Sequence, residues 1–299
     1  VTGLIIRLGG SAAGISIQDN TYTLTGVALN YGRSGYEFKL ADKPGTFYLH
    51  QVSWAGNSDE LLVEKLSRFR DAREFLLANH RSGVIAKAYA ETDPAWVDME
   101  PSANEGLEWI RGGQAFVIIS ERDGWRRAYV VSRDGSSKTP ITAAGTDLIA
   151  RGQMDDKNAW FYYFASPTNA TQRYLYRARL DGTGTPERLT HDGTILRFDG
   201  VPSPDGAWIA YYDKNNVLWA FNITERRNVR IAASANGQFA DLTWSPDSRW
   251  LAYVMPDANT FSRVFLYNLG DGSTTPLTSD RTESSSPAWS PDGKWVYLL

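Results

Sequence analysis

Cysteine is absent from the 299-residue sequence, and histidine and methionine occur only three times each. The lack of cysteine excludes disulfide bonds, thiolate metal sites and cysteine nucleophiles. No apolar run approaches the roughly 20 residues that a membrane-spanning helix requires. Lys and Arg total 31 against 34 for Asp and Glu, a formal net charge of −3. This balance favours neither a nucleic-acid partner nor a membrane surface, because both select basic patches.

Motifs of enzyme chemistry are also missing. A serine hydrolase needs a serine on a sharp turn, a histidine base and an orienting acid, but the sequence contains no Gly-x-Ser-x-Gly elbow. The nearest stretch, Gly-Arg-Ser-Gly at residues 32–35, has the wrong spacing and favours a loop. His50, His80 and His191 each fall near a predicted loop or strand end, and no His-x-His or His-Glu-x-x-His pattern occurs. We therefore predict no catalytic residue, no metal and no cofactor in this chain.

Aromatic residues, by contrast, make up 13% of the sequence, with 11 Trp and 15 Tyr. Such side chains favour pleated, half-buried surfaces and therefore strands. A chain of this length is long for one ordinary domain, but an architecture that adds modules around a ring can reach it. The composition, 42% hydrophobic and 22% charged, is that of a soluble globular protein.

A repeat organises the chain. Three stretches share the pattern Ser-Pro-Asp with a Trp three residues after the Asp: residues 203–211, 245–253 and 290–297. Weaker copies occur at 54–58, 109–113 and 154–160. The residue two before the Pro, or its equivalent, recurs every 42 to 55 residues, at Trp54, Trp109, Met154, Pro202, Trp244 and Trp289. This spacing is typical of the blades of a β-propeller.

Each repeat predicts four strands. Ser-Pro-Asp-Gly suits a type I turn, in which Pro presets φ and Gly tolerates the exit. An alternating strand follows, as at residues 208–212, then a third strand, as at 217–222, an Asp-Gly turn and a short outer strand. One blade cannot bury both of its apolar faces alone, so its neighbours in a ring must cover them. We predict an all-β fold, a single β-propeller domain over residues 1–299.

Blades are expected to start near residues 20, 51, 107, 151, 200, 242 and 285. The count is six or seven, depending on whether residues 20–50 form a full blade. Residues 1–17 resemble a third strand, a turn and a fourth strand, so we expect them to complete the blade that starts near 285 and to close the ring. The alternative is a chain that stops mid-blade because it is a segment of a longer protein.

The stretch Asp59–Asn79 admits two interpretations. By composition it reads as an amphipathic helix. Because the surrounding unit is a blade, we favour two strands, residues 61–66 and 74–78, joined by a charged turn.

Residues 45–190 resemble the N-terminal propeller of dipeptidyl peptidase IV-type serine peptidases. The most specific match is Ser-Glu-Arg-Asp-Gly-Trp-Arg at residues 120–126, supported by the stretches at 48–54, 91–98 and 165–176. Residues 191–299 look more like the propeller of tricorn-type peptidases, on the stretches at 199–206, 213–219 and 264–267. Ser-Pro-Asp-Gly also marks TolB-like propellers. The two-part resemblance is compatible with a divergent member or with a recombined or engineered propeller.

The resemblance implies a propeller that cuts no peptide bonds. In both peptidase families the propeller acts as a funnel or lid beside a separate catalytic domain. We therefore expect a non-catalytic propeller domain of a serine peptidase that gates and positions peptides, with a peptide substrate or a hydrolase domain as partner. The alternatives are a stand-alone TolB-like scaffold that binds a protein, or a recombined propeller without selected function. The implied setting is periplasmic or extracellular. The adjacent glutamates that hold a substrate's amino terminus in the dipeptidyl peptidases have no counterpart here, because no Glu-Glu pair occurs.

The densest charged and aromatic run supplies the candidate binding residues Glu121, Asp123, Trp125 and Arg126. One interpretation is a surface that meets a peptide or the catalytic domain. The other, which we favour, is a blade hairpin with an Arg–carboxylate pair and a Trp packed between blades.

Overall fold

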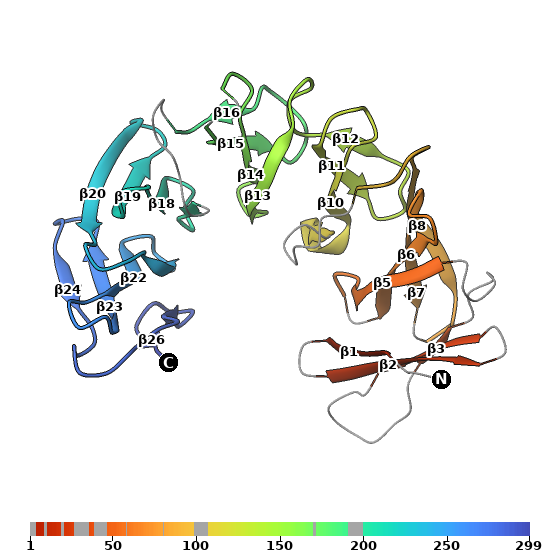
Figure 1. Cartoon of the computed structure of the whole chain (residues 1–299), viewed down its shortest axis with the longest axis horizontal. Coiled ribbons are helices and arrows are strands. Elements are labelled where there is room, and N and C mark those ends of the chain that lie inside the picture. Colours follow the sequence, from red (N-terminus) through yellow and green to blue (C-terminus); the bar gives the residue numbers. More distant parts are fainter. Residues whose placement is uncertain are drawn as a thin grey trace. The chain divides into compact units, whose positions relative to one another are not determined.

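The computed structural model describes residues 4–8, 11–18, 21–26, 36–38, 47–57, 59–79, 81–98, 107–169, 172–190 and 200–299. Contacts divide the chain into two compact units, Val1–Pro140 and Ile141–Leu299. Both units consist of antiparallel sheets (Figure 1). Within the described ranges no helix is long and apolar enough to cross a membrane.

The first unit contains three four-stranded sheets, in each of which the strands pair in sequence order. The first sheet consists of β1 (Leu4–Leu8), β2 (Ser11–Gln18), β3 (Thr21–Gly26) and β4 (Tyr36–Phe38). The second consists of β5 (Phe47–Trp54), β6 (Glu60–Ser67), β7 (Ala72–Asn79) and β8 (Ile85–Thr92). The third consists of β9 (Glu108–Ile110), β10 (Ala115–Ser120), β11 (Arg127–Ser132) and β12 (Lys138–Pro140), with a short 3-10 turn, η1 (Arg111–Gly113), between β9 and β10.

The second unit repeats this pattern. Its three four-stranded sheets are β13 (Leu148–Asp155) to β16 (Glu187–Arg188), β17 (Val201–Pro202) to β20 (Arg227–Ala233), and β21 (Ala240–Trp244) to β24 (Thr274–Pro276). Their middle strands are β14 (Trp160–Ala165), β15 (Tyr174–Arg179), β18 (Trp208–Tyr212), β19 (Val217–Asn222), β22 (Trp250–Pro256) and β23 (Ser262–Asn268). A two-stranded sheet follows, β25 (Ala288–Trp289) with β26 (Val296–Tyr297).

The core lies between neighbouring sheets. In the first unit, Phe75 and Tyr89 of one sheet pack against Phe116 and Tyr129 of the next, and the rings of Phe75 and Phe116 meet edge-on at 6.2 Å. All six residues of β10 are buried.

The second unit shows the same packing. Apolar side chains of sheets β13–β16 and β17–β20 form one cluster, and those of β17–β20 and β21–β24 form another. The first strands of consecutive sheets are neighbours, since β13 contacts β17, β17 contacts β21, and β21 contacts β25. The sheets therefore follow one another in sequence order with their first strands side by side, as blades do in a propeller.

The Ser-Pro-Asp turns form as predicted. Ser203 Oγ donates to Asp205 Oδ1 at 2.5 Å and accepts from the Trp208 backbone N–H at 3.0 Å. The turns that begin at Ser245 and Ser290 repeat both bonds. All three serines are buried. The hydroxyl thus accepts from the backbone N–H at the start of each second strand, a group that would otherwise need water as its partner.

Two expectations need correction or qualification. The first described sheet starts at β1, not near residue 20, because β2 and β3 are joined by only two residues and pair directly as a hairpin. Residues 4–8 and 11–18 therefore belong to this sheet with β3 and β4, and their completing the blade near residue 285 stays a prediction. The closure of one ring over residues 1–299 and the count of six or seven blades stay predictions.

The stretch 59–79 is the hairpin β6–β7, so the two-strand interpretation is confirmed. The stretch resembles an amphipathic helix in composition because both faces of this hairpin are buried. Leu61 and Val63 pack on one side while Leu62 and Leu77 pack on the other, which gives a continuous apolar run instead of a clean alternation.

Candidate functional site

The β10–β11 turn carries the four candidate residues. Gly124 adopts a φ of +85°, and its N–H donates to Glu121 O at 2.8 Å, which closes the turn. Asp123 accepts from Arg127 NH1 at 2.5 Å and from the Trp125 backbone N–H at 3.3 Å. This ion pair lowers the pKa of the Asp123 carboxyl, because the bonds from Arg127 outweigh its partial burial.

The turn contacts the segment that follows β8. Arg126 is buried, and its Nε lies 3.8 Å from Asp98 Oδ2. Trp125, in contrast, is 43% exposed, so it is not packed between sheets. The Arg–carboxylate pair that the sequence led us to expect is present. The binding role of Glu121, Asp123, Trp125 and Arg126 stays a prediction.

Behind this turn a buried polar network lies between the β5–β8 sheet and the β9–β12 sheet. Arg73 Nε donates to Glu64 Oε1 at 2.7 Å, and Arg73 NH1 lies 3.5 Å from Glu91 Oε1. The hydroxyls of Tyr89 and Ser120 donate to Glu91 Oε2 at 2.7 and 2.5 Å. Since Ser120 belongs to β10 and Glu91 to β8, the network joins the two sheets.

Strand alternation explains where the network forms. Each polar residue of the network lies two positions along its strand from a residue of the apolar core between the β5–β8 and β9–β12 sheets. These core residues are Leu62, Phe75, Tyr89 and Ile118, next to Glu64, Arg73, Glu91 and Ser120 in that order. Residues two apart face the same side of a strand. The polar groups are therefore the continuation of one core toward one end of the sheets.

His50 completes the network at the surface. It is the extra residue where the register of β5 against β6 shifts, a position that re-aims a side chain. Its Nδ1 lies 3.0 Å from Glu64 Oε2. Burial alone would raise the pKa of Glu64, but the bond with His50 and the charge of Arg73 outweigh it and lower that pKa. Burial and the Glu91 charge raise the pKa of Tyr89.

These contacts are structural in character. His50 contacts a carboxylate, and the absence of a catalytic residue in this chain stays a prediction. His80, His191 and the 32–35 stretch lie outside the described residues. Sequence reasoning missed Glu64, Arg73 and Glu91 because a charged residue in a strand usually faces solvent. The available signal was their two-residue spacing from apolar positions.

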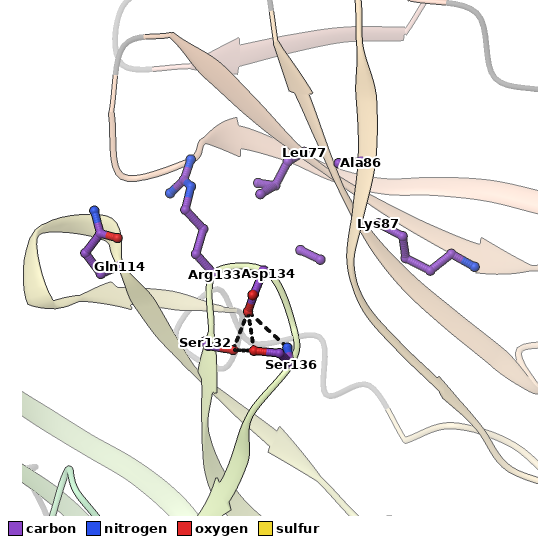
Figure 2. Close-up of a pocket in the computed structure, with 9 residues that line it drawn as sticks. Leu77, Ala86, Lys87, Gln114, Ser132, Arg133, Asp134 and Ser136 are labelled. Carbon is purple, nitrogen blue, oxygen red and sulfur yellow. Dashed lines mark hydrogen bonds between the residues drawn. The ribbon is translucent and has the colours of Figure 1, made fainter.

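A pocket of about 560 Å³ lies at the opposite end of the same sheets (Figure 2). Leu77 and Ala86 form part of its wall, with Lys87, Arg133 and Asp134 beside them. Its charges are already paired: Lys87 with Glu74, and Arg133 with Glu60.

Asp134 in the pocket wall has local partners. It accepts from the hydroxyls of Ser132 and Ser136, both at 2.7 Å, and these bonds lower its pKa to about 2. Gly135 holds the turn against β8, since a Cβ there would lie 1.9 Å from Ala88 O. The β11–β12 turn is therefore a packed inter-sheet contact, and its serines and carboxylate are engaged in forming it.

Comparison with curated proteins finds peptidases. The chain is 27% identical over 97 residues to a tricorn protease homolog of Saccharolobus solfataricus, a match that covers 32% of this chain and 9% of that protein. It is 23% identical over 171 residues to dipeptidyl peptidase 4 of Trichophyton equinum, covering 56% of this chain and 22% of that protein. The chain thus spans less than a quarter of the length of these two relatives.

Among solved structures, dipeptidyl peptidase 4 of Porphyromonas gingivalis superposes with a TM-score of 0.58 at 17% identity, over 80% of this chain and 35% of that one. At this identity the likeness shows the fold alone. The sequence model of the dipeptidyl peptidase IV N-terminal region matches residues 20–210, more than half of the chain. The match extends the resemblance seen at residues 45–190 on both sides. The chain belongs to the family of the dipeptidyl peptidase IV N-terminal region.

Proposed function

We propose that this chain is a non-catalytic propeller domain of a serine peptidase, which gates and positions peptide substrates for a separate hydrolase domain. The observation that carries the proposal is the family match over residues 20–210. The peptidase relatives are several times longer than the matched stretches, which leaves room in those proteins for a catalytic part.

The contacts between sheets suit a positioning element. A wall that selects substrates must hold its shape, and buried polar bonds fix neighbouring sheets in one register. Glu91 bonds Ser120 across one sheet boundary, and Trp244 Nε1 donates to Val201 O at 2.9 Å across another. Such bonds are lost only at a cost of roughly 1–3 kcal/mol each when a buried partner is left unpaired.

Partner and location follow from the same proposal. The partner is a peptide substrate or the hydrolase domain, and the setting is periplasmic or extracellular. Aminodipeptidase specificity is not included, because the sequence has no Glu-Glu pair to bind a substrate's amino terminus.

A peptidase assay tests the proposal. Dipeptide and oligopeptide reporters are incubated with the 299-residue chain and with any longer polypeptide that contains it. The expected result is turnover by the longer polypeptide only, with longer peptides cleaved once this domain is deleted. Turnover by the 299-residue chain would mean that it contains its own nucleophile, and would overturn the proposal.

A second candidate is a stand-alone scaffold that binds a protein partner. The observation in its favour is the number of large apolar side chains left exposed at one end of the first unit, including Phe69 at 83% and Trp96 at 60%. Inactivity of both the chain and the longer polypeptide would favour this function over the first.

A further inference from the structure

Four exposed aromatic side chains lie at one end of the second and third sheets of the first unit. They are Tyr48 (44% exposed), Phe69 (83%), Trp96 (60%) and Trp125 (43%), and together they are named the aromatic rim. Tyr48 is the second residue of β5, Phe69 is in the β6–β7 turn, Trp96 follows β8, and Trp125 is in the β10–β11 turn. Strand pairing brings the start of β5, the end of β6, the start of β7 and the end of β8 to the same edge.

Hydrogen bonds hold these segments together. The β6–β7 turn accepts from the segment after β8 through Val97 N to Arg70 O at 2.7 Å and Asp93 N to Asp71 O at 2.9 Å. The Arg126–Asp98 pair ties that segment to the β10–β11 turn. The exposed rings therefore stand on anchored turns.

The segment after β8 is also ordered from within. Asp93 Oδ1 accepts from the backbone N–H groups of Ala95 and Trp96, at 2.7 and 3.1 Å. This capping fixes the backbone that carries the Trp96 ring. A ring on a fixed backbone loses little conformational freedom when a partner covers it, which favours binding.

Arginines accompany the rings. Arg68 donates to Tyr48 Oη at 3.1 Å and stacks over its ring, and Arg122 donates to Tyr89 Oη at 3.4 Å. Arg70 is exposed in the same turn as Phe69. Within the described residues, Arg68, Arg70 and Arg122 form no ion pair with a carboxylate, whereas the neighbouring Arg126 and Arg127 do.

This combination has a recognisable chemistry. Tryptophan, tyrosine and arginine carry most of the binding energy at protein interfaces. Unpaired guanidinium groups favour a partner that brings carboxylates, because charge-assisted bonds to carboxylates are stronger than neutral ones. The exposed rings favour apolar side chains on the same partner.

A polypeptide fits better than a nucleic acid. Carboxylates are interleaved with the arginines in the same turns, at Asp71, Asp93, Asp98 and Asp123. They would repel a continuous row of phosphates, and the chain as a whole has a net charge of −3. A peptide with separate carboxylates can place each one beside an arginine and away from these acids.

We propose that the aromatic rim binds an extended, acidic polypeptide segment with apolar side chains, through its exposed rings and the guanidinium groups of Arg68, Arg70 and Arg122. This inference goes beyond the proposed function, because it requires no hydrolase domain. It specifies a surface and the chemistry of its partner.

Fluorescence anisotropy with labelled peptides tests the inference. The probe is a twelve-residue peptide of three Glu-Pro-Phe-Asp repeats, in which proline favours an extended chain. The matched peptide carries Lys in place of every acid, and a single-stranded oligothymidine serves as the nucleic-acid probe. We expect saturable binding of the acidic peptide, weaker at high salt, with the other two probes bound at least about tenfold more weakly, the difference that 1.4 kcal/mol makes.

Variants assign the binding to the rim. The double variant Phe69→Ala/Trp96→Ala and the single variant Arg122→Gln should each weaken binding about tenfold. The matched controls Val84→Ala and Arg81→Gln change exposed residues of the β7–β8 turn, at the opposite end of the same sheet, and should leave the affinity unchanged. Unchanged thermal unfolding confirms that each variant is folded.

The outcomes separate clearly. Tight binding of the basic peptide or the oligothymidine, rim variants that bind like the wild type, or no binding of the acidic peptide would each overturn the inference. Because the measurement uses the 299-residue chain without any hydrolase, its result is independent of the peptidase assay.

Discussion

Arg73 and Glu64 face each other across the β6–β7 hairpin, with Arg73 Nε 2.7 Å from Glu64 Oε1 and both side chains almost fully buried. A buried ion pair contributes little net stability compared with an apolar pair of the same volume, because desolvation opposes the attraction. Breaking such a pair is costly, however, since one charge is left buried alone. The network around Arg73 is therefore a sensitive probe of how the two sheets hold together.

Replacing Arg73 with Met should destabilise the protein by about 3–5 kcal/mol, because Glu64 would lose its buried cation. Urea unfolding followed by tryptophan fluorescence measures the change. The double variant Arg73→Met/Glu64→Leu is the control, since it removes the uncompensated charge, and it should recover part of the loss. A single variant as stable as the wild type would contradict the network as drawn.

At acidic pH the free energy of unfolding should fall, in part because Glu64 becomes protonated. The folded state lowers the pKa of Glu64 below its usual 4.5, so the unfolded state binds a proton first as pH falls. The stability that this lowering contributes is present above the unfolded pKa and is lost as pH falls through the folded pKa. Urea unfolding between pH 7 and pH 3 should show this slope.

In Glu64→Gln the slope should be shallower, because the titrating group is gone. The control is Asp181→Asn. Asp181 lies in an exposed turn, and local hydrogen bonds from Thr183 lower the pKa of its carboxyl as well. Because that turn is open to solvent, the change should matter much less. An identical pH slope in Glu64→Gln and the wild type would show that other groups dominate acid unfolding.

Much of the fold could be predicted because the repeat contains residues that are typical of tight turns. Ser203 donates to Asp205, Asp205 also accepts from the Ala207 backbone N–H, and Gly206 adopts the positive φ of the turn. In the turn at Ser245 the glycine is replaced by Ser248, yet the turn persists with φ at +61°, and Ser248 Oγ accepts from Asp205 N of the neighbouring sheet. Local patterns therefore located most of the sheets.

The candidate site was less predictable because its bonds join distant residues. Glu91 and Ser120 are 29 positions apart, and nothing in either neighbourhood marks the other as its partner. The correction at residues 4–18 has a related cause. Resemblance to the late strands of a blade describes a strand's type, whereas pairing depends on which neighbour is nearest along the chain, and β3 follows β2 after two residues.

Gly135 offers a test of inter-sheet contact. Its φ is +71°, and an added Cβ would lie 1.9 Å from Ala88 O of β8. Gly135→Ala should therefore lower the free energy of unfolding by about 1–2 kcal/mol, the usual cost of an alanine in the left-handed region. It should lower it further because the two sheets must move apart to admit the Cβ. Gly124→Ala is the matched control, with φ at +85° and no atom of a described residue within 4 Å of the added Cβ. Equal melting temperatures for the two variants would refute the close contact between the turn and β8.

Two tryptophans at equivalent repeat positions give a paired test. Trp244 Nε1 donates to Val201 O at 2.9 Å, which links neighbouring sheets of the second unit. Trp109 Nε1 is buried and bonds to none of the residues that the structure describes, and its ring packs against Phe116 at 5.2 Å. Replacement by Phe keeps an aromatic ring at either position and removes the indole N–H.

Trp244→Phe should cost about 1 kcal/mol more than Trp109→Phe, because it removes a hydrogen bond between two sheets, whereas the second change removes an indole N–H that bonds to no described residue. Both variants lose a similar apolar area, so their difference isolates the hydrogen bond. Urea unfolding of the two variants and the wild type measures it. A larger loss for Trp109→Phe would show that packing against Phe116 and the cation contact from Arg133, 4.8 Å from the Trp109 ring, matter more than the link between sheets.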